Sequence, residues 1–452
     1  MRHYLYSLAV MLLAATSVGT AQTLKDGYVD WGPSGTEILS TIDTWTSSHK
    51  INDDDHFFVT RVKSKARFRN TATQVKTTLT DTNDKRLLCW LPWEDSNVRG
   101  FNANALPTGT FDAEIFSMWS YVDHWGNWSA PLGRVPAAML DVAHKNGVSV
   151  STVAGIPQNS ITSTGYATWY NNISEAYGAK AAPMLFYYGS QGLGYNSEFT
   201  GNNAGQQRVI AFHKRLIQDL KALGDPNAEN IWYDGTNDNG TNTFDSKLSG
   251  YQGLVGTDSE PVFGIFLNYN SMGAYALNTV VSNAASFGRN SVNAAYAGMN
   301  MQGGQPSSNW SNLKNYAVSI GLWGAHSSNM FFQNRYVLGT TPEQQQRSYL
   351  LSTERWFGGG HRNPVLHTSA YNNVNYSPGN IENNPGMCSM MSARSTLQWN
   401  LGEEPFVTFF NLGNGTFFNW KGVRANNNEW ANVVVQDYLP TWRFWFHNNW
   451  LG

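Results

Sequence analysis

The feature that most constrains the fold of this chain is a series of short apolar segments that alternate with helical patterns over about 240 residues. Eight of these segments are candidate strands: residues 87–91, 121–125, 148–156, 194–199, 231–234, 263–269, 294–301 and 318–323. Short, continuous apolar runs are typical of strands that are buried on both faces, as in a parallel sheet. Eight such units over roughly 250 residues match a (β/α)8 barrel, and we predict this α/β fold.

Two segments between the candidate strands carry clear helix signals. Residues 136–146 begin with a proline, which is favoured in a first helical turn, and end before Gly147. Residues 206–223 carry an apolar stripe at helical spacing that is closed by Gly224. A doubly wound sheet is the alternative, but its G-x-G-x-x-G turn does not follow the first strand, and the glycines of residues 189–194 lead into a strand.

The rest of the chain is divided around this barrel. Residues 1–21 have the basic start, apolar run and small terminal residues of a cleavable signal peptide, so we expect a secreted or periplasmic protein. No lipobox cysteine stands at the cleavage point, and no later apolar run approaches the roughly 20 residues of a membrane span. We expect an N-terminal segment over 22–84, the catalytic barrel over 85–400, and a short β-rich extension over 401–452.

Several apolar segments in the C-terminal part also predict secondary structure. We expect a helix over 342–357 and strands over 406–410, 416–418 and 433–435. One interpretation of the extension is a truncated accessory sandwich.

Composition narrows the class of ligand. Charged residues and aromatic residues each make up 14% of the chain, with 18 Trp and 21 Tyr, and the formal net charge is −2. A chain without clustered Lys and Arg is not expected to bind nucleic acid, because phosphates demand such clusters. An uncharged, aromatic surface is instead typical of proteins that stack on sugar rings.

The sequence contains only weak signals for a metal site or a disulfide. Residues 53–56 (Asp-Asp-Asp-His) are interpreted as a solvated loop, His361 and His367 lack a carboxylate at metal spacing, and no H-E-x-x-H motif occurs. We therefore expect no metal and no cofactor. Secretion would permit a bridge between Cys89 and Cys388, but Cys89 belongs to an apolar strand, which favours a buried free thiol.

The fourth candidate strand ends in a polar pair. Strand alternation places Asn196 and Glu198 on one face, and Tyr195, Ser197 and Phe199 on the other. Reactive groups of a (β/α)8 barrel lie at the C-terminal ends of its strands. An amide in place of a second carboxylate suits a substrate that carries its own nucleophile. An ordinary pair of polar residues at a strand end is the alternative.

Aromatic and polar residues also lie at or near the ends of other candidate strands. Rings can stack on the C–H faces of sugars, while amides and carboxylates bind hydroxyl groups. Core packing is the alternative for each tryptophan. The predicted substrate-binding residues are Trp90, Trp93, Trp125, Trp128, Trp232, Asp234, Asn268, Tyr269 and Trp323.

An ordered set of short motifs resembles one known family. These motifs are A-H-K-N-G-V at 143–148, N-S-E at 196–198, I-W-Y-D-G at 231–235, F-L-N-Y at 266–269, W-A-N at 430–432 and Q-D-Y-L-P-T-W-R at 436–443. Over residues 86–445 the chain is similar to glycoside hydrolase family 85, the endo-β-N-acetylglucosaminidases that act on N-linked glycans. Two positions depart from the family: residues 244–245 are Phe-Asp where it has Trp-Gln, and residues 270–272 lack its Trp.

The resemblance implies a substrate-assisted retaining mechanism in which the glycan's own 2-acetamido group is the nucleophile. It implies that Asn196 orients this group, that Glu198 is the acid and base, and that Tyr233 also contacts the acetamide. N-linked glycans or glycoproteins are then the expected partners, cut in their GlcNAc-β-1,4-GlcNAc core. Two alternatives remain: a non-catalytic carbohydrate-binding barrel, and another retaining glycosidase acting on chitin or cell-wall sugars.

Overall fold

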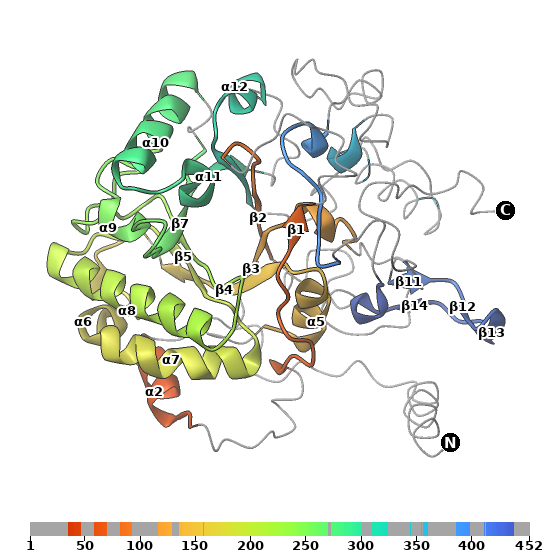
Figure 1. The fold of residues 1–452 in the computed structure, drawn as a ribbon. Helices are drawn as coiled ribbons and strands as arrows, with labels where there is room; N and C mark the ends of the chain where they lie inside the picture. The colour runs from red at the N-terminus through yellow and green to blue at the C-terminus, as the bar shows by residue number, and fades with distance from the viewer. Residues whose placement is uncertain are drawn as a thin grey trace.

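The computed structural model describes residues 35–46, 58–69, 82–92, 116–128, 135–156, 158–269, 273–300, 310–323, 344, 354, 356–359, 386–397, 411 and 413–437. Within these residues eight parallel strands close into a barrel. Figure 1 shows the strands surrounded by helices. The strands are β2 (Leu87–Pro92), β3 (His124–Trp128), β4 (Ser149–Ile156), β5 (Leu193–Ser197), β6 (Asn230–Tyr233), β7 (Phe263–Leu267), β8 (Ala295–Asn300) and β9 (Ser319–Trp323). The predicted (β/α)8 barrel is confirmed.

The strands are numbered in chain order around the barrel, and β2 pairs with β9 to close it. One predicted strand begins later than expected, because residues 119–121 form a 3-10 turn, η1 (Trp119–Tyr121), before β3 starts at His124. The signal-peptide segment, the strand over 406–410 and most of the helix over 342–357 lie outside the described residues.

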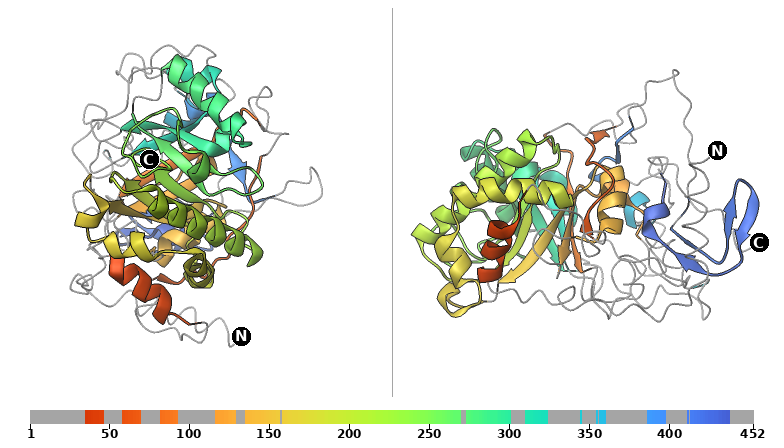
Figure 2. Two further views of the ribbon diagram at one scale, coloured as in Figure 1. Left: turned by 90° about the vertical axis from the view of Figure 1, so that its left-hand side faces the viewer. Right: turned by 90° about the horizontal axis from the view of Figure 1, so that it is seen from below.

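Helices cover the outside of the barrel (Figures 1 and 2). They are α5 (Ala137–Lys145), α6 (Ala167–Asn172), α7 (Glu175–Tyr188), α8 (Asn203–Ala222), α9 (Gln252–Val255), α10 (Ala274–Ser286), α11 (Ser291–Ala294) and α12 (Trp310–Asn315). The earlier helix α2 (Gly35–Thr44) is attached to α7 by Asp43, whose carboxylate accepts hydrogen bonds from Tyr177 and Lys180. No helix in the described part of the chain is long and apolar enough to cross a membrane.

The barrel interior is packed around two large aromatic side chains. Trp90 on β2 and Phe266 on β7 stack with ring centroids 5.0 Å apart and an interplanar angle of 6°. Glycines on nearby strands leave room for them: a Cβ at Gly126 would lie 2.0 Å from Trp90, and one at Gly298 or Gly321 would lie 2.8 or 2.6 Å from Phe266. The interior is thus a filled core, as expected of a (β/α)8 barrel.

A buried polar cluster lies below this aromatic layer, toward the N-terminal ends of the strands. The guanidinium of Arg86 donates two hydrogen bonds to the carboxylate of Glu229, at 2.8 and 2.6 Å. The hydroxyl of Tyr296 donates to the same carboxylate at 2.8 Å. His124 Nδ1 lies 3.5 Å from Glu229, and its Nε2 is hydrogen-bonded to Ser151. The charges of this cluster are paired, as buried charges must be.

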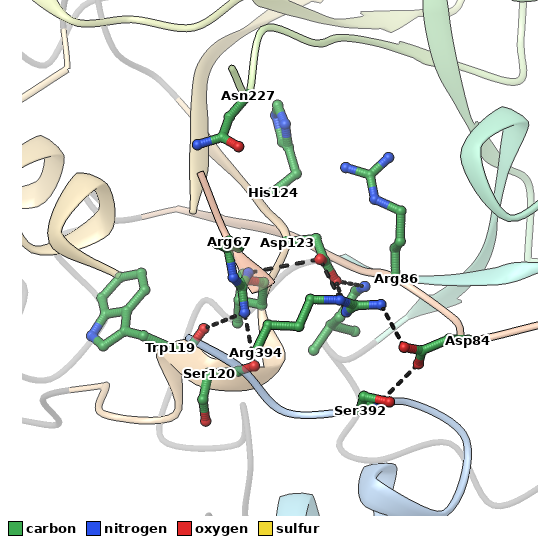
Figure 3. A network of polar contacts seen from close by, with 12 residues as sticks. Arg67, Asp84, Arg86, Trp119, Ser120, Asp123, His124, Asn227, Ser392 and Arg394 are labelled. Carbon is green, nitrogen blue, oxygen red and sulfur yellow. Dashed lines mark hydrogen bonds and ion pairs between the residues drawn. The ribbon is translucent and has the colours of Figure 1, made fainter. Parts of the chain in front are cut away.

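A second ionic network joins the C-terminal part of the chain to this end of the barrel (Figure 3). Arg394 donates to both oxygens of Asp123 at 3.1 Å and lies 3.1 Å from a carboxylate oxygen of Asp84. Asp84 accepts the backbone N–H of Ser392, and Arg67 lies 3.7 Å from Asp123. Next to this network β1 (Phe68–Arg69) pairs antiparallel with β10 (Arg394–Ser395).

The C-terminal extension contains two small antiparallel pairs: β11 (Asn414–Gly415) with β14 (Trp430–Ala431), and β12 (Phe418–Trp420) with β13 (Val423–Asn426). The strand expected over 433–435 is wrong: these residues form the 3-10 helix η7 (Val433–Val435). The side chain of Asn432 accepts the N–H of Val434 and caps this turn, which outweighs the strand preference of valine. The side chain of Gln436 then bonds Trp119 and the Phe116 carbonyl, which holds the segment against the barrel.

Both cysteines, Cys89 on β2 and Cys388 in the 3-10 helix η6 (Met387–Ser389), are buried and do not form a disulfide with each other, as predicted.

Candidate active site

The polar pair predicted at the end of β5 is present. Tyr195, Ser197 and Phe199 are fully buried, whereas Asn196 and Glu198 are only half-buried, so the predicted alternation is confirmed. The amide Nδ2 of Asn196 donates a hydrogen bond to Glu198 Oε2 at 3.0 Å. The two side chains therefore point the same way at the C-terminal mouth of the barrel.

The chain after β6 holds this pair in place. The N–H of Thr236 donates to the Ser197 carbonyl, and the Ser197 hydroxyl donates to the carbonyl of Tyr233. A Cβ at Gly235 would lie 2.2 Å from the Ser197 carbonyl oxygen, so only glycine permits this close approach. These contacts consequently join the ends of β5 and β6 next to Glu198.

Two tyrosines lie within electrostatic reach of Glu198. Burial raises the pKa of the Tyr233 hydroxyl, and the negative charges of Glu198 and Asp234 raise it further. Burial likewise raises the pKa of Tyr269, with Tyr233 and Glu198 adding to the effect. Both tyrosines therefore keep their hydroxyl protons at neutral pH. The hydroxyl of Tyr233 donates its proton to Asn268 Oδ1 at 3.2 Å.

Aromatic rings surround this mouth. Trp90 is buried beneath it, 6.5 Å by ring centroids from both Tyr233 and the half-buried Trp323. Tyr233 also lies 6.4 Å from the ring of Tyr269 and 6.0 Å from that of Phe244. Tyr233, Tyr269, Phe244 and Trp323 thus form one aromatic wall from three strands and their loops, which suits a flat-faced ligand such as a sugar ring. Trp90, predicted to bind substrate, is only 1% exposed and fills the core beneath this wall instead.

Two tryptophans predicted to bind substrate do not belong to this wall. Trp125 is buried against Phe116 and Trp119, with ring centroids 5.3 and 5.4 Å away. Trp232 is buried against Phe263 at 5.2 Å, and its indole N–H donates to a backbone carbonyl. Both side chains pack in the layer between the barrel and its helices. The prediction is wrong for these two, because their alternation turns them outward.

The carboxyl group of Asp234 is also placed differently from the prediction. The residue is fully buried, and its Oδ2 accepts the backbone N–H groups of Ser246 at 2.6 Å and Asn268 at 3.2 Å. The carboxyl group therefore binds backbone N–H groups of the protein and not a sugar hydroxyl. Trp93 and the side chain of Trp128 lie outside the described residues.

Phe244, whose ring lies beside Tyr233 at this mouth, is not predicted from the sequence to belong to the site. It begins a segment in which Phe244, Ser246 and Leu248 all have left-handed backbone angles, with φ of 45°, 58° and 65°. Such angles are uncommon outside glycine, and no sequence signal announces them. The one clue was that Phe244 lies where the resembling family has an aromatic residue. Among the described residues no group of three or more His, Cys, Asp or Glu side chains could hold a metal ion.

The described residues thus combine a (β/α)8 barrel with a carboxyl–amide pair and an aromatic wall at its C-terminal mouth, where the active sites of such barrels lie. The model of glycosyl hydrolase family 85 matches residues 99–418, and the chain belongs to this family. The family expected from the sequence motifs is thereby confirmed.

The fold resembles that of a solved glycoside hydrolase domain. The glycoside hydrolase domain of Endo-D from Streptococcus pneumoniae R6 matches with a TM-score of 0.69 and 20% identity, over 90% of this chain and 61% of that one. This chain thus spans less than two thirds of that structure. A family 18 chitinase from Crocus vernus has a TM-score of only 0.31 and 12% identity, over 53% of this chain and 93% of its own. No curated protein matches the chain by sequence.

Proposed function

We propose that this protein is an endo-β-N-acetylglucosaminidase that hydrolyses the GlcNAc-β-1,4-GlcNAc core of N-linked glycans. Membership of family 85 and the likeness to the Endo-D domain support this activity. The observation that carries the proposal is the hydrogen bond between Asn196 and Glu198. It puts an amide where a two-carboxylate glycosidase would have its second carboxylate, while the nearby carboxyl of Asp234 is buried and engaged.

In the proposed mechanism Glu198 and Asn196 each have a defined part. Glu198 gives its proton to the departing glycosidic oxygen as the 2-acetamido oxygen attacks the anomeric carbon, which forms an oxazoline-type intermediate. Glu198, now a carboxylate, takes a proton from the water that opens this intermediate. Asn196 Nδ2 donates its hydrogen bond to Glu198 Oε2, which leaves Oδ1 of the same amide to accept the acetamido N–H. This hydrogen bond holds the nucleophile in attack geometry.

The first test removes the proposed acid. Glu198→Gln should lower turnover by about 10²-fold or more, since acid–base catalysis contributes that much. The matched control is Glu260→Gln, which changes an exposed glutamate paired with Lys214. The assay is intact-mass spectrometry of a high-mannose glycoprotein, in which the product keeps a single N-acetylglucosamine on its Asn. Equal turnover of the two variants would contradict the assignment, and binding without cleavage by the unchanged protein would favour a carbohydrate-binding barrel.

The second test addresses the orienting amide. Asn196→Ala should lose activity on intact glycans and regain part of it when a preformed oxazoline donor is supplied, because that donor bypasses the acetamide attack. Equal loss on both substrates would show that Asn196 does not act through the acetamido group.

A further inference from the structure

The carboxyl group of Asp234 joins two loops of the site through a single oxygen. Its Oδ2 accepts the N–H of Ser246, in the loop that follows β6, and the N–H of Asn268, at the end of β7. Asp234 itself follows β6 directly, and its own N–H donates to the Phe266 carbonyl on β7. Nothing in the proposed reaction uses this fully buried group.

The side chain of Asn268 extends this connection to Tyr233. Its Oδ1 accepts the N–H of Tyr269 at 2.7 Å and the hydroxyl of Tyr233 at 3.2 Å. Because a backbone N–H can only donate, the amide of Asn268 cannot be flipped, and its oxygen must face Tyr233. The hydroxyl proton of Tyr233 is thereby directed at Asn268, which leaves the lone pairs of its oxygen for a donor of the bound sugar.

We propose that Asp234 is a positioning residue of this active site: it ties the loop after β6 to the end of β7, and through Asn268 it sets the direction of the Tyr233 hydroxyl. The proposal rests on the proposed function, because it assigns Asp234 a part in the same reaction.

The loop that Asp234 holds needs such a tether. Ser246 is the middle one of the three left-handed residues, between Phe244 and Leu248, and its N–H bond to Asp234 is the shorter of the two at 2.6 Å. Residues in such conformations persist only where surrounding contacts impose them. Phe244, at the start of this stretch, places its ring beside Tyr233. Release of Ser246 would therefore free one side of the aromatic wall as well.

The contribution of Asp234 depends on hydrogen-bond acceptance more than on charge. Burial raises its pKa to about 7, while the N–H groups of Asn268 and Ser246 and the hydroxyl of Tyr251 act in the opposite direction. The negative charge of Asp245 acts with burial. A neutral amide oxygen at this position can accept the same two N–H groups. Asp234→Asn should then preserve what Asp234→Ala removes.

A second aspartate of the same loop supplies the control. Asp238 also accepts two backbone N–H groups, from Gly253 at 2.6 Å and Leu254 at 2.9 Å, but these belong to α9 and not to the mouth. Asp238→Ala removes the same kind of interaction without a connection to Tyr233.

The experiment compares these variants on intact glycan. We expect Asp234→Asn to stay within about threefold of the unchanged protein, and Asp234→Ala to lose roughly 10- to 100-fold in kcat with little change in KM, since misplaced catalytic groups cost that much. Asp234→Ala combined with Tyr233→Phe should be no slower than the slower single variant. An inactive Asp234→Asn, an equal loss in Asp238→Ala, or fully multiplicative effects with Tyr233→Phe would each overturn the proposal.

Hydrogen exchange separates this proposal from the proposed activity. Peptides that cover 244–248 and 267–269 should exchange faster in Asp234→Ala but not in Asp234→Asn or Asp238→Ala. This result supports the tether even if no glycan is cleaved, a failure that would count against the proposed function alone. Unchanged exchange in Asp234→Ala would overturn the tether itself.

Discussion

Substitution of Glu229 in the barrel interior tests how much a buried ion pair contributes to the free energy of unfolding. Its carboxylate accepts two hydrogen bonds from Arg86, at 2.8 and 2.6 Å, and a third from Tyr296 at 2.8 Å. The side chain of Glu229 is 10% exposed and that of Arg86 is 22% exposed. Glu229→Gln leaves the guanidinium inside the barrel with no opposite charge in contact. Removal of one partner from a buried pair destabilises by about 3–5 kcal/mol, and we expect a loss of that order in the free energy of unfolding.

The pH dependence of this loss has a defined sign. Burial alone would raise the pKa of Glu229, but the charge of Arg86 and the contacts with Arg86 and His124 outweigh it and hold the pKa well below 4.5. A lowered carboxyl pKa stabilises the fold above the unfolded-state pKa, and this contribution disappears as the pH falls toward the folded-state value. The difference between the original protein and Glu229→Gln should therefore be complete above about pH 5 and shrink below it.

Urea unfolding followed by tryptophan fluorescence at pH 7 and pH 4 measures both effects. Glu260→Gln is the control, because the Glu260–Lys214 pair has a similar 2.8 Å distance but side chains that are 52% and 38% exposed. Such surface pairs contribute about 1 kcal/mol or less. Adding Arg86→Met to Glu229→Gln should recover much of the loss, since no unpaired charge remains. Equal, small losses for Glu229→Gln and Glu260→Gln would refute the reasoning.

Two further predictions concern the packed interior. Gly126→Ala places a methyl group 2.0 Å from Trp90 Cδ1, so it should lower the free energy of unfolding by about 1–3 kcal/mol and raise the KM for glycan, as measured by urea unfolding and steady-state kinetics. The second prediction concerns His213, a buried residue of α8. Its Nδ1 donates a hydrogen bond to the Val209 carbonyl, and its Nε2 accepts one from the Tyr195 hydroxyl. Burial lowers the pKa of this ring to about 3. The stability that depends on neutral His213 is complete above about pH 6.5 and is lost as the pH falls toward 3, so His213→Gln should flatten the decline in unfolding free energy between pH 6.5 and pH 4.

Either prediction can fail clearly. Unchanged stability and KM in Gly126→Ala would mean that Trp90 does not fill the space above that glycine. An identical pH slope for His213→Gln and the original protein would mean that this histidine does not control the acid limb.

Much of the barrel was predictable because its signal is local. A strand buried on both faces appears as a short apolar run, and the eight runs agree with the eight strands to within a few residues. Residues 121–123 were the exception, because the 3-10 turn at Trp119–Tyr121 is apolar as well and cannot be distinguished by hydrophobicity. The strand predicted over 433–435 was wrong for a similar reason, since its valines favour strands while Asn432 caps a 3-10 turn.

The candidate site was predictable only in part. Alternation within β5 correctly grouped Asn196 with Glu198, because one strand needs no knowledge of its neighbours. It did not show that Trp125 and Trp232 face the helices or that Asp234 bonds two loops, because alternation separates two faces without stating which face is inward.

The sequence by itself determined the number of βα units, the helix that closes at Gly224, the polar pair at the end of β5 and the family. Tertiary structure decided which aromatic residues meet: the register that sets Trp90 opposite Gly126 lets the indole fill the barrel beneath the mouth. It also decided the left-handed loop at 244–248 and the role of Asp234. The physical reason is distance along the chain. Local periodicity is encoded in neighbouring residues, whereas barrel closure and the hydrogen bonds of buried groups join residues that only the folded chain brings together.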